Sequence, residues 1–113
     1  MSNPPLDEKT LADLRATLGD DFLPELIATY LEETPLLIKD LQQALAEGNA
    51  QAFTRLAHSI KSSSSSLGAL DFSDKARELE TIGKSGDLSQ AALKLTEFIG
   101  TYPELEQSLK NLL

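Results

Sequence analysis

Apolar residues recur every three or four positions along almost the whole chain, and this spacing is the strongest constraint on its fold. Such intervals place successive side chains on one face of an α-helix, whereas a half-buried strand needs alternate positions. The composition agrees, because leucine occurs 22 times and alanine 12 times, while isoleucine occurs five times and valine is absent. Leucine and alanine favour helices, and β-branched residues favour strands. The sequence therefore predicts an all-α protein.

Glycines, prolines and capping residues divide this pattern into segments. We expect an extended lead over residues 1–6, which contains Pro4 and Pro5, and a short helix over residues 7–18 that stops at Gly19. Longer helices are expected over residues 21–47, 49–67, 71–85 and 87–112. Long amphipathic helices with short connections are typical of an antiparallel bundle. The predicted fold is an antiparallel four-helix bundle with a short extra N-terminal helix across one end, in one domain over residues 1–113.

The expected helix ends rest on particular residues. The candidate N-caps are Asp20 or Asp21, Asn49, Asp71 or Ser73, and Asp87. Glycines follow the expected ends, at Gly48, at Gly68, and at Gly83 and Gly86 together. Pro24 falls in a first turn, where proline costs little, but Pro35 lies inside the 21–47 helix and should kink or split it. Pro103 should bend the last helix in the same way.

The run Ser62–Ser66 has the composition of a flexible linker. Five serines cost a helix about 2.5 kcal/mol relative to alanine. The apolar pattern nevertheless continues through the run to Leu67, and Gly68 follows where a helix would stop. We therefore expect the run to be helical, with small side chains selected for something other than stability.

Charge and composition exclude several classes of protein. The chain has 18 acidic and 10 basic residues, a formal net charge of −8, which disfavours nucleic acids and anionic membrane surfaces. It contains no cysteine, which excludes disulfides, thiolate catalysis and cysteine-based metal sites. No apolar run reaches the roughly 20 residues of a transmembrane helix, and the first residues lack the features of a signal peptide. We expect a cytoplasmic protein.

His58 is the only histidine. At 100° per residue it points about 160° away from the apolar face of its helix, so it should be exposed. The side chains around it are small or basic, namely Thr54, Arg55, Lys61, Ser62 and Ser65. A neutral imidazole is nucleophilic near pH 7 and can hold a phosphoryl group, whose charge a lysine three residues on could stabilise.

His58 has no accompanying motif for autonomous chemistry. The chain has no phosphate-binding loop, no nucleotide motif and no evident metal site. A lone histidine without cysteine argues against zinc, and a Ser-His-Asp triad on one helix face would lack an oxyanion hole. The chain would be a carrier without its own kinase activity, and the alternative is a surface histidine without a role.

The segment Leu56–Ala69 reads LAHSIKSSSSSLGA and resembles the signature of histidine-containing phosphotransfer (HPt) domains. It is similar in its His-x-x-Lys, followed by small residues and then by an apolar residue and glycine. The upstream FLPEL and YLEETP and the downstream Leu79-Glu80 are also similar to that family. The likeness spans roughly residues 20–113.

This resemblance implies a four-helix bundle that carries phosphoryl groups between receiver-domain aspartates in a multistep phosphorelay. It implies that His58 accepts the group, that Lys61 and Lys84 stabilise it, and that Glu80 orients the imidazole. A turn near residues 69–70 would also place residue 58 opposite residues 80–82. The alternative for Glu80 and Lys84 is an ordinary exposed ion pair.

The implied partners are receiver domains of response regulators or hybrid sensor kinases, with magnesium in the receiver, no cofactor in this chain, and a monomeric carrier. We expect docking on Thr54, Arg55, Ser62 and Ser65. Most family members have glycine after the lysine, so Ser62 bears on docking affinity. Two alternatives stay open: the phospho-accepting module of a chemotaxis-type kinase, and a helical adaptor without covalent chemistry.

Overall fold

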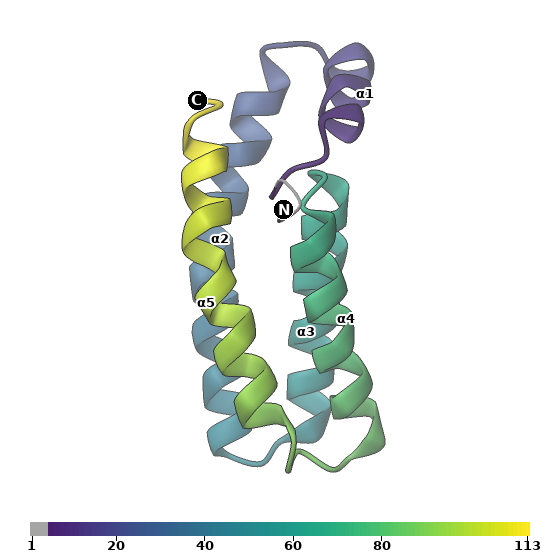
Figure 1. The fold of residues 1–113 in the computed structure, drawn as a ribbon, viewed down its shortest axis with the longest axis vertical. Coiled ribbons are helices and arrows are strands. Elements are labelled where there is room, and N and C mark those ends of the chain that lie inside the picture. The colour runs from purple at the N-terminus through teal and green to yellow at the C-terminus, as the bar shows by residue number, and fades with distance from the viewer. Residues whose placement is uncertain (1–4) are drawn as a thin grey trace.

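A computed structural model describes residues 5–113, in which α-helices account for most of the chain (Figure 1). The helices are α1 (Glu8–Leu18), α2 (Phe22–Ala46), α3 (Ala50–Ser66), α4 (Leu70–Ser85) and α5 (Ala91–Lys110). No strand occurs in the described residues, so the predicted all-α class is confirmed. Of the expected extended lead, residues 1–4 lie outside the described part, and the chain bends at Pro5 and Leu6. None of the helices in residues 5–113 has the length and hydropathy that crossing a membrane requires.

Helices α2 to α5 run alternately in opposite directions and form the predicted antiparallel four-helix bundle (Figure 1). Each packs against the next along the chain, and α5 also packs against α2. The short α1 lies at one end of the bundle, close to the turn between α3 and α4 (Figure 1). The backbone N–H of Asp7 donates to the carbonyl of Gly68 at 2.8 Å, which ties the start of α1 to that turn.

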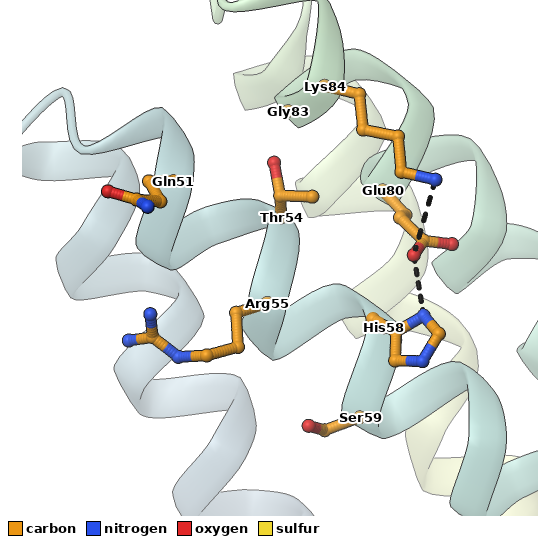
Figure 2. A pocket seen from close by; sticks show the side chains of 8 residues that line it. All are labelled: Gln51, Thr54, Arg55, His58, Ser59, Glu80, Gly83 and Lys84. Carbon is orange, nitrogen blue, oxygen red and sulfur yellow. Dashed lines mark hydrogen bonds and ion pairs between the residues drawn. The ribbon is translucent and has the colours of Figure 1, made fainter.

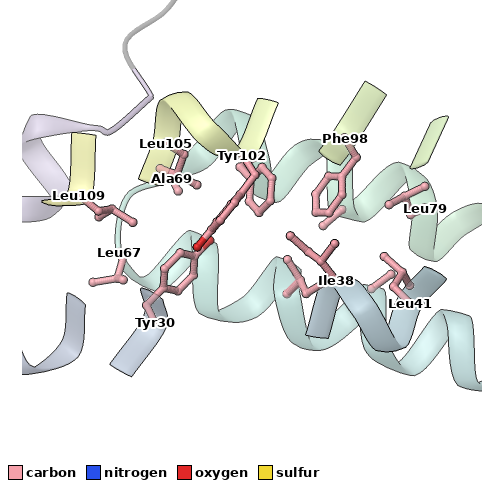
Figure 3. Packing of buried hydrophobic residues seen from close by; sticks show 14 of the residues in the cluster. Tyr30, Ile38, Leu41, Leu67, Ala69, Leu79, Phe98, Tyr102, Leu105 and Leu109 are labelled. Carbon is pink, nitrogen blue, oxygen red and sulfur yellow. The ribbon is translucent and has the colours of Figure 1, made fainter. Parts of the chain in front are cut away.

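The core is built from one apolar face of each helix. Phe72 stacks on Phe98 with ring centroids 4.2 Å apart, and Tyr102 lies beside Phe72. Figure 3 shows Phe98 and Tyr102 within the packed core. The largest completely buried apolar side chains are Ile27, Leu41, Phe53, Ile60, Leu79, Phe98 and Leu109. Burial of these side chains supplies the main driving force for folding. Leu56 and Ile82 are only partly buried, at the edge of the core.

The serine run is helical, as predicted, because α3 extends to Ser66. Ser64 is completely buried, and its hydroxyl lies 2.7 Å from the hydroxyl of Tyr30. Ser63 and Ser66 each donate to a backbone carbonyl one turn earlier in the same helix. Such bonds satisfy serine hydroxyls inside a helix. The run is therefore part of the bundle and carries one polar group into the core.

The predicted N-cap of α4 is wrong, although the helix begins at Leu70, one residue before its expected start. Neither Asp71 nor Ser73 caps this helix, since Ala69 occupies its N-cap position without a side-chain hydrogen bond. The hydroxyl of Ser73 instead donates to the carbonyl of Lys61 on α3 at 2.8 Å. A contact with the neighbouring helix has taken the place of the expected cap.

The predicted start of α5 at residue 87 is also wrong, since the helix begins at Ala91. Asp87 accepts a hydrogen bond from the backbone N–H of Ser89 and closes a turn ahead of the helix. At the start of α2, Asp21 occupies the N-cap position without a side-chain hydrogen bond. Asn49 caps α3 as predicted, by accepting from the N–H of Ala52 at 3.0 Å.

Pro35 and Gly83 lie inside helices and do not end them. Pro35 does not split its helix, because α2 is continuous from Phe22 to Ala46. Gly83 does not help to end α4, because it lies inside that helix. The residue that ends α4 is Gly86, whose φ of 79° is the left-handed conformation typical of a glycine C-cap.

Candidate functional site

His58 lies on the middle of α3, and its side chain is 57% exposed, as the periodicity predicted. Its Nδ1 atom is 2.6 Å from Oε2 of Glu80, which comes from the neighbouring α4 (Figure 2). A carboxylate at Nδ1 favours the tautomer that carries its proton there, and so leaves the lone pair on Nε2. The imidazole is thus both oriented and accessible.

Glu80 is a buried carboxylate with a side chain that is only 6% exposed. Its Oε1 accepts from Nζ of Lys61 at 2.7 Å, while Nζ of Lys84 lies 3.8 Å from Oε2. The hydrogen bond from Lys61, reinforced by that from His58, holds the pKa of the Glu80 carboxyl below its ordinary value, against the opposing effect of burial. The alternative of an ordinary exposed ion pair with Lys84 does not describe Glu80, because the Glu80 side chain is buried.

The two lysines differ in their surroundings. Lys61 is on α3 and 23% exposed, and its ammonium is hydrogen-bonded to Glu80. Lys84 is on α4, 68% exposed, and only loosely paired with the same carboxylate. Both cations lie within reach of the carboxylate that orients His58, so the three groups form one electrostatic cluster.

An open depression of about 620 Å³ adjoins the exposed imidazole (Figure 2). Its lining consists of Gln51, Thr54, Arg55, His58, Ser59, Glu80, Gly83 and Lys84. Of the residues predicted for docking, Thr54 and Arg55 line this depression, whereas Ser62 and Ser65 are exposed on α3 outside it. Within residues 5–113, no three histidine or acidic side chains gather in a way that could hold a metal ion.

Two residues beside the site were not identified from the sequence. Gly83 faces Thr54 where α3 and α4 touch, and Ser73 bonds the carbonyl of Lys61. One indication of both residues was present in the sequence, namely that each is small and lies in a predicted helix interface. That signal was ambiguous, because glycine and serine also mark helix ends.

Comparisons with known proteins agree with this geometry. The Hpt domain family matches residues 25–113. The phosphorelay protein LuxU of Vibrio vulnificus strain YJ016 is 27% identical over 103 residues, which cover 91% of this chain and 90% of LuxU. LuxU of Vibrio harveyi is 23% identical over 99 residues, covering 88% and 87% of the two chains.

A solved structure is also similar. The crystal structure of histidine-containing phosphotransfer protein B (HptB) from Pseudomonas aeruginosa PAO1 superimposes with a TM-score of 0.90 at 30% identity, covering 97% of this chain and 95% of HptB. The resemblance seen in the sequence is therefore confirmed. The chain belongs to the Hpt domain family and is a histidine phosphotransfer intermediate of two-component signalling.

Proposed function

We propose that Nε2 of His58 accepts a phosphoryl group from the aspartyl phosphate of one receiver domain and passes it to an aspartate of another. The observation that carries this proposal is an exposed imidazole whose Nδ1 lies 2.6 Å from a buried carboxylate. Orientation by such a carboxylate leaves one nitrogen free for attack and removes the cost of ordering the ring during transfer.

The chemistry of the step explains why the orienting group is an anion. The Nε2 lone pair forms a P–N bond while the P–O bond of the acyl phosphate breaks, and the receiver's carboxylate leaves. The proton stays on Nδ1, so the phosphorylated ring becomes cationic. The Glu80 carboxylate at that nitrogen stabilises the developing positive charge, as an acidic residue does beside a catalytic histidine.

We assign different first roles to the two lysines. Lys84 is mostly exposed and only 3.8 Å from Glu80, so it is the cation more easily directed to phosphoryl oxygens. Lys61 holds Glu80 in place, and it would contact the phosphoryl group by exchanging that hydrogen bond. Magnesium belongs to the receiver in this proposal, and this chain contributes no cofactor.

The docking surface in this proposal is the face of α3 around His58, formed by Thr54, Arg55, Ser62 and Ser65. The cations beside it stand out in a chain of net charge −8 and suit a partner that presents a phosphorylated aspartate. Ser62→Gly should preserve transfer, whereas Ser62→Trp should block it by keeping the receiver away. Unimpaired transfer by the tryptophan variant would exclude this face as the docking surface. The proposal includes a monomeric carrier in the cytoplasm.

The test is incubation with a receiver that carries radiolabelled aspartyl phosphate. Label should appear on this chain in acid-labile form, and His58→Gln should lose it completely. Gln51→Ala is the matched control and should keep the label. Gln51 lines the same depression but lies about two helical turns before His58 on α3. Label that persists on His58→Gln would overturn the proposal.

Labelling only by an ATP-binding kinase domain would favour a chemotaxis-type module. Biological output that survives His58→Ala would favour a non-covalent adaptor.

A further inference from the structure

Helices α3 and α4 approach each other closely where Thr54 faces Gly83 (Figure 2). A Cβ atom added at Gly83 would collide with Oγ1 of Thr54 and would lie 3.1 Å from both its Cα and its Cβ. Thr54 cannot turn aside freely, since its Oγ1 donates to the carbonyl of Ala50 at 2.7 Å. Any side chain at position 83 would therefore push the two helices apart or shift them along each other.

This contact lies one helical turn from the hydrogen bond that orients the imidazole. Thr54 precedes His58 by four residues on α3, and Gly83 follows Glu80 by three residues on α4. The link between Nδ1 and Oε2 is 2.6 Å long, at the short end of the hydrogen-bond range. A change of a few tenths of an ångström in the helix separation would lengthen it directly.

A second close contact lies on the other side of the same hydrogen bond. The hydroxyl of Ser73 on α4 donates to the carbonyl of Lys61 on α3 at 2.8 Å. Between the two contacts, Ala57 and Ala76 are completely buried. Because the helices are antiparallel, Thr54–Gly83 and Lys61–Ser73 bracket the pair formed by His58 and Glu80.

We infer that Gly83 is a positioning residue for phosphoryl transfer: its lack of a side chain sets the separation of α3 and α4 that keeps Glu80 in hydrogen-bonding reach of His58. The kinetic part of this inference rests on the function proposed above. Its geometric part concerns the imidazole alone and can be measured without a partner.

The experiment compares Gly83→Ala with Gly100→Ala. Gly100 lies inside α5, and a Cβ there would meet nothing within 4 Å, so it is a matched control for the change in helix propensity. Two quantities are measured: the fraction of His58 protonated at Nδ1 in the neutral ring, by ¹⁵N NMR, and the rate of phosphoryl uptake from a phosphorylated receiver. Gly83→Ala should lose the single tautomer and slow uptake about tenfold, since small misplacements of reacting groups are costly. Gly100→Ala should change neither.

Rescue separates positioning from a general loss of structure. Thr54→Ala in the Gly83→Ala background removes the colliding hydroxyl, so the double variant should recover both the tautomer and part of the rate relative to Gly83→Ala. If Gly83→Ala does not fold, the same substitution is compared with Thr54→Ala as the parent. There the remaining contacts of 3.1 Å should still reduce both quantities, by a smaller factor.

A folded Gly83→Ala protein with an unchanged tautomer and a rate within about twofold of the parent would overturn the inference while leaving the proposed function intact. Conversely, a wild-type protein that takes no label from any receiver would overturn the proposed function. The NMR comparison would still decide whether Gly83 positions Glu80.

Discussion

Helices α4 and α5 are neighbours in the bundle, yet they bury different kinds of side chain. The buried face of α5 consists of Ala91, Leu95, Phe98, Tyr102, Leu105 and Leu109. The buried face of α4 interrupts its apolar residues with Ser73, Glu80 and Gly83, all of which face α3. Packing of large apolar groups on α5 contributes stability, whereas the polar and small groups on α4 order the site.

This difference shows that burial serves two purposes within one bundle. A buried carboxylate costs free energy unless its charge is compensated, and Glu80 is compensated by Lys61 and His58. A small residue in a helix interface gives up buried apolar area, and here it permits the close approach of α3 and α4. Substitutions on α5 should therefore affect stability, and substitutions at the polar and small residues of α4 should affect transfer.

Phe98→Ala should have the largest effect and should act on stability alone. Phe98 is 1% exposed and stacks on Phe72, so truncation leaves a cavity that costs about 3–5 kcal/mol. Urea denaturation measures the loss, and uptake of the phosphoryl group by the folded fraction should stay at the wild-type rate. A fall in the rate per folded molecule would mean that α5 also shapes the site.

Glu80→Gln should affect the rate of transfer more than the stability of the fold. The amide keeps the shape of the side chain but removes the charge that stabilises the cationic ring, and loss of such a supporting group costs about 10–100-fold in rate. Glu78→Gln is the matched control on the same helix, because Glu78 is 59% exposed and, within residues 5–113, pairs only with Lys94 at 3.6 Å. Equal rates for the two variants would contradict the role given to Glu80.

The pH dependence of stability tests the pairing of the Glu80 carboxylate independently of transfer. Its folded-state pKa is lowered from 4.5, mainly by the hydrogen bond from Lys61, so the unfolded chain binds the proton more tightly. The stabilisation is therefore complete above about pH 4.5 and is lost as the pH falls through the folded-state pKa. The difference in free energy of unfolding between wild type and Glu80→Gln should shrink over that interval, and a constant difference would contradict the pairing.

Replacing each of the two buried tyrosines by phenylalanine should give the smallest effects, and the free energy of unfolding should change differently in the two variants. Tyr30→Phe leaves the hydroxyl of Ser64 buried without its partner and should cost about 1–2 kcal/mol. The Tyr102 hydroxyl has no hydrogen-bond partner within residues 5–113, so Tyr102→Phe should be neutral or stabilising by up to about 1 kcal/mol. Denaturation curves of both variants measure the contrast. A larger loss at Tyr102 would point to a partner for its hydroxyl, such as a bound water.

Much of the site could be predicted from local pattern. The angular position of His58 followed from helical periodicity, and counting residues from a turn near residues 69–70 placed residues 80–82 opposite it, a range that begins with Glu80. The N-cap of α4 and the start of α5 could not be predicted in this way, because Ser73 and Asp87 can cap a helix or bond elsewhere with similar energy. Which bond forms depends on the neighbouring segment, as the contact of Ser73 with α3 illustrates.

The amino-acid sequence by itself determined the helices, their order, and the exposure of His58, since these depend on the spacing of apolar residues within each segment. Only the tertiary structure decided that Glu80 is buried, that Lys61 binds it, and that Gly83 lets two helices close on each other. The reason is that a hydrogen bond or collision between α3 and α4 depends on their separation to a few tenths of an ångström. That separation is set jointly by all the side chains in the interface.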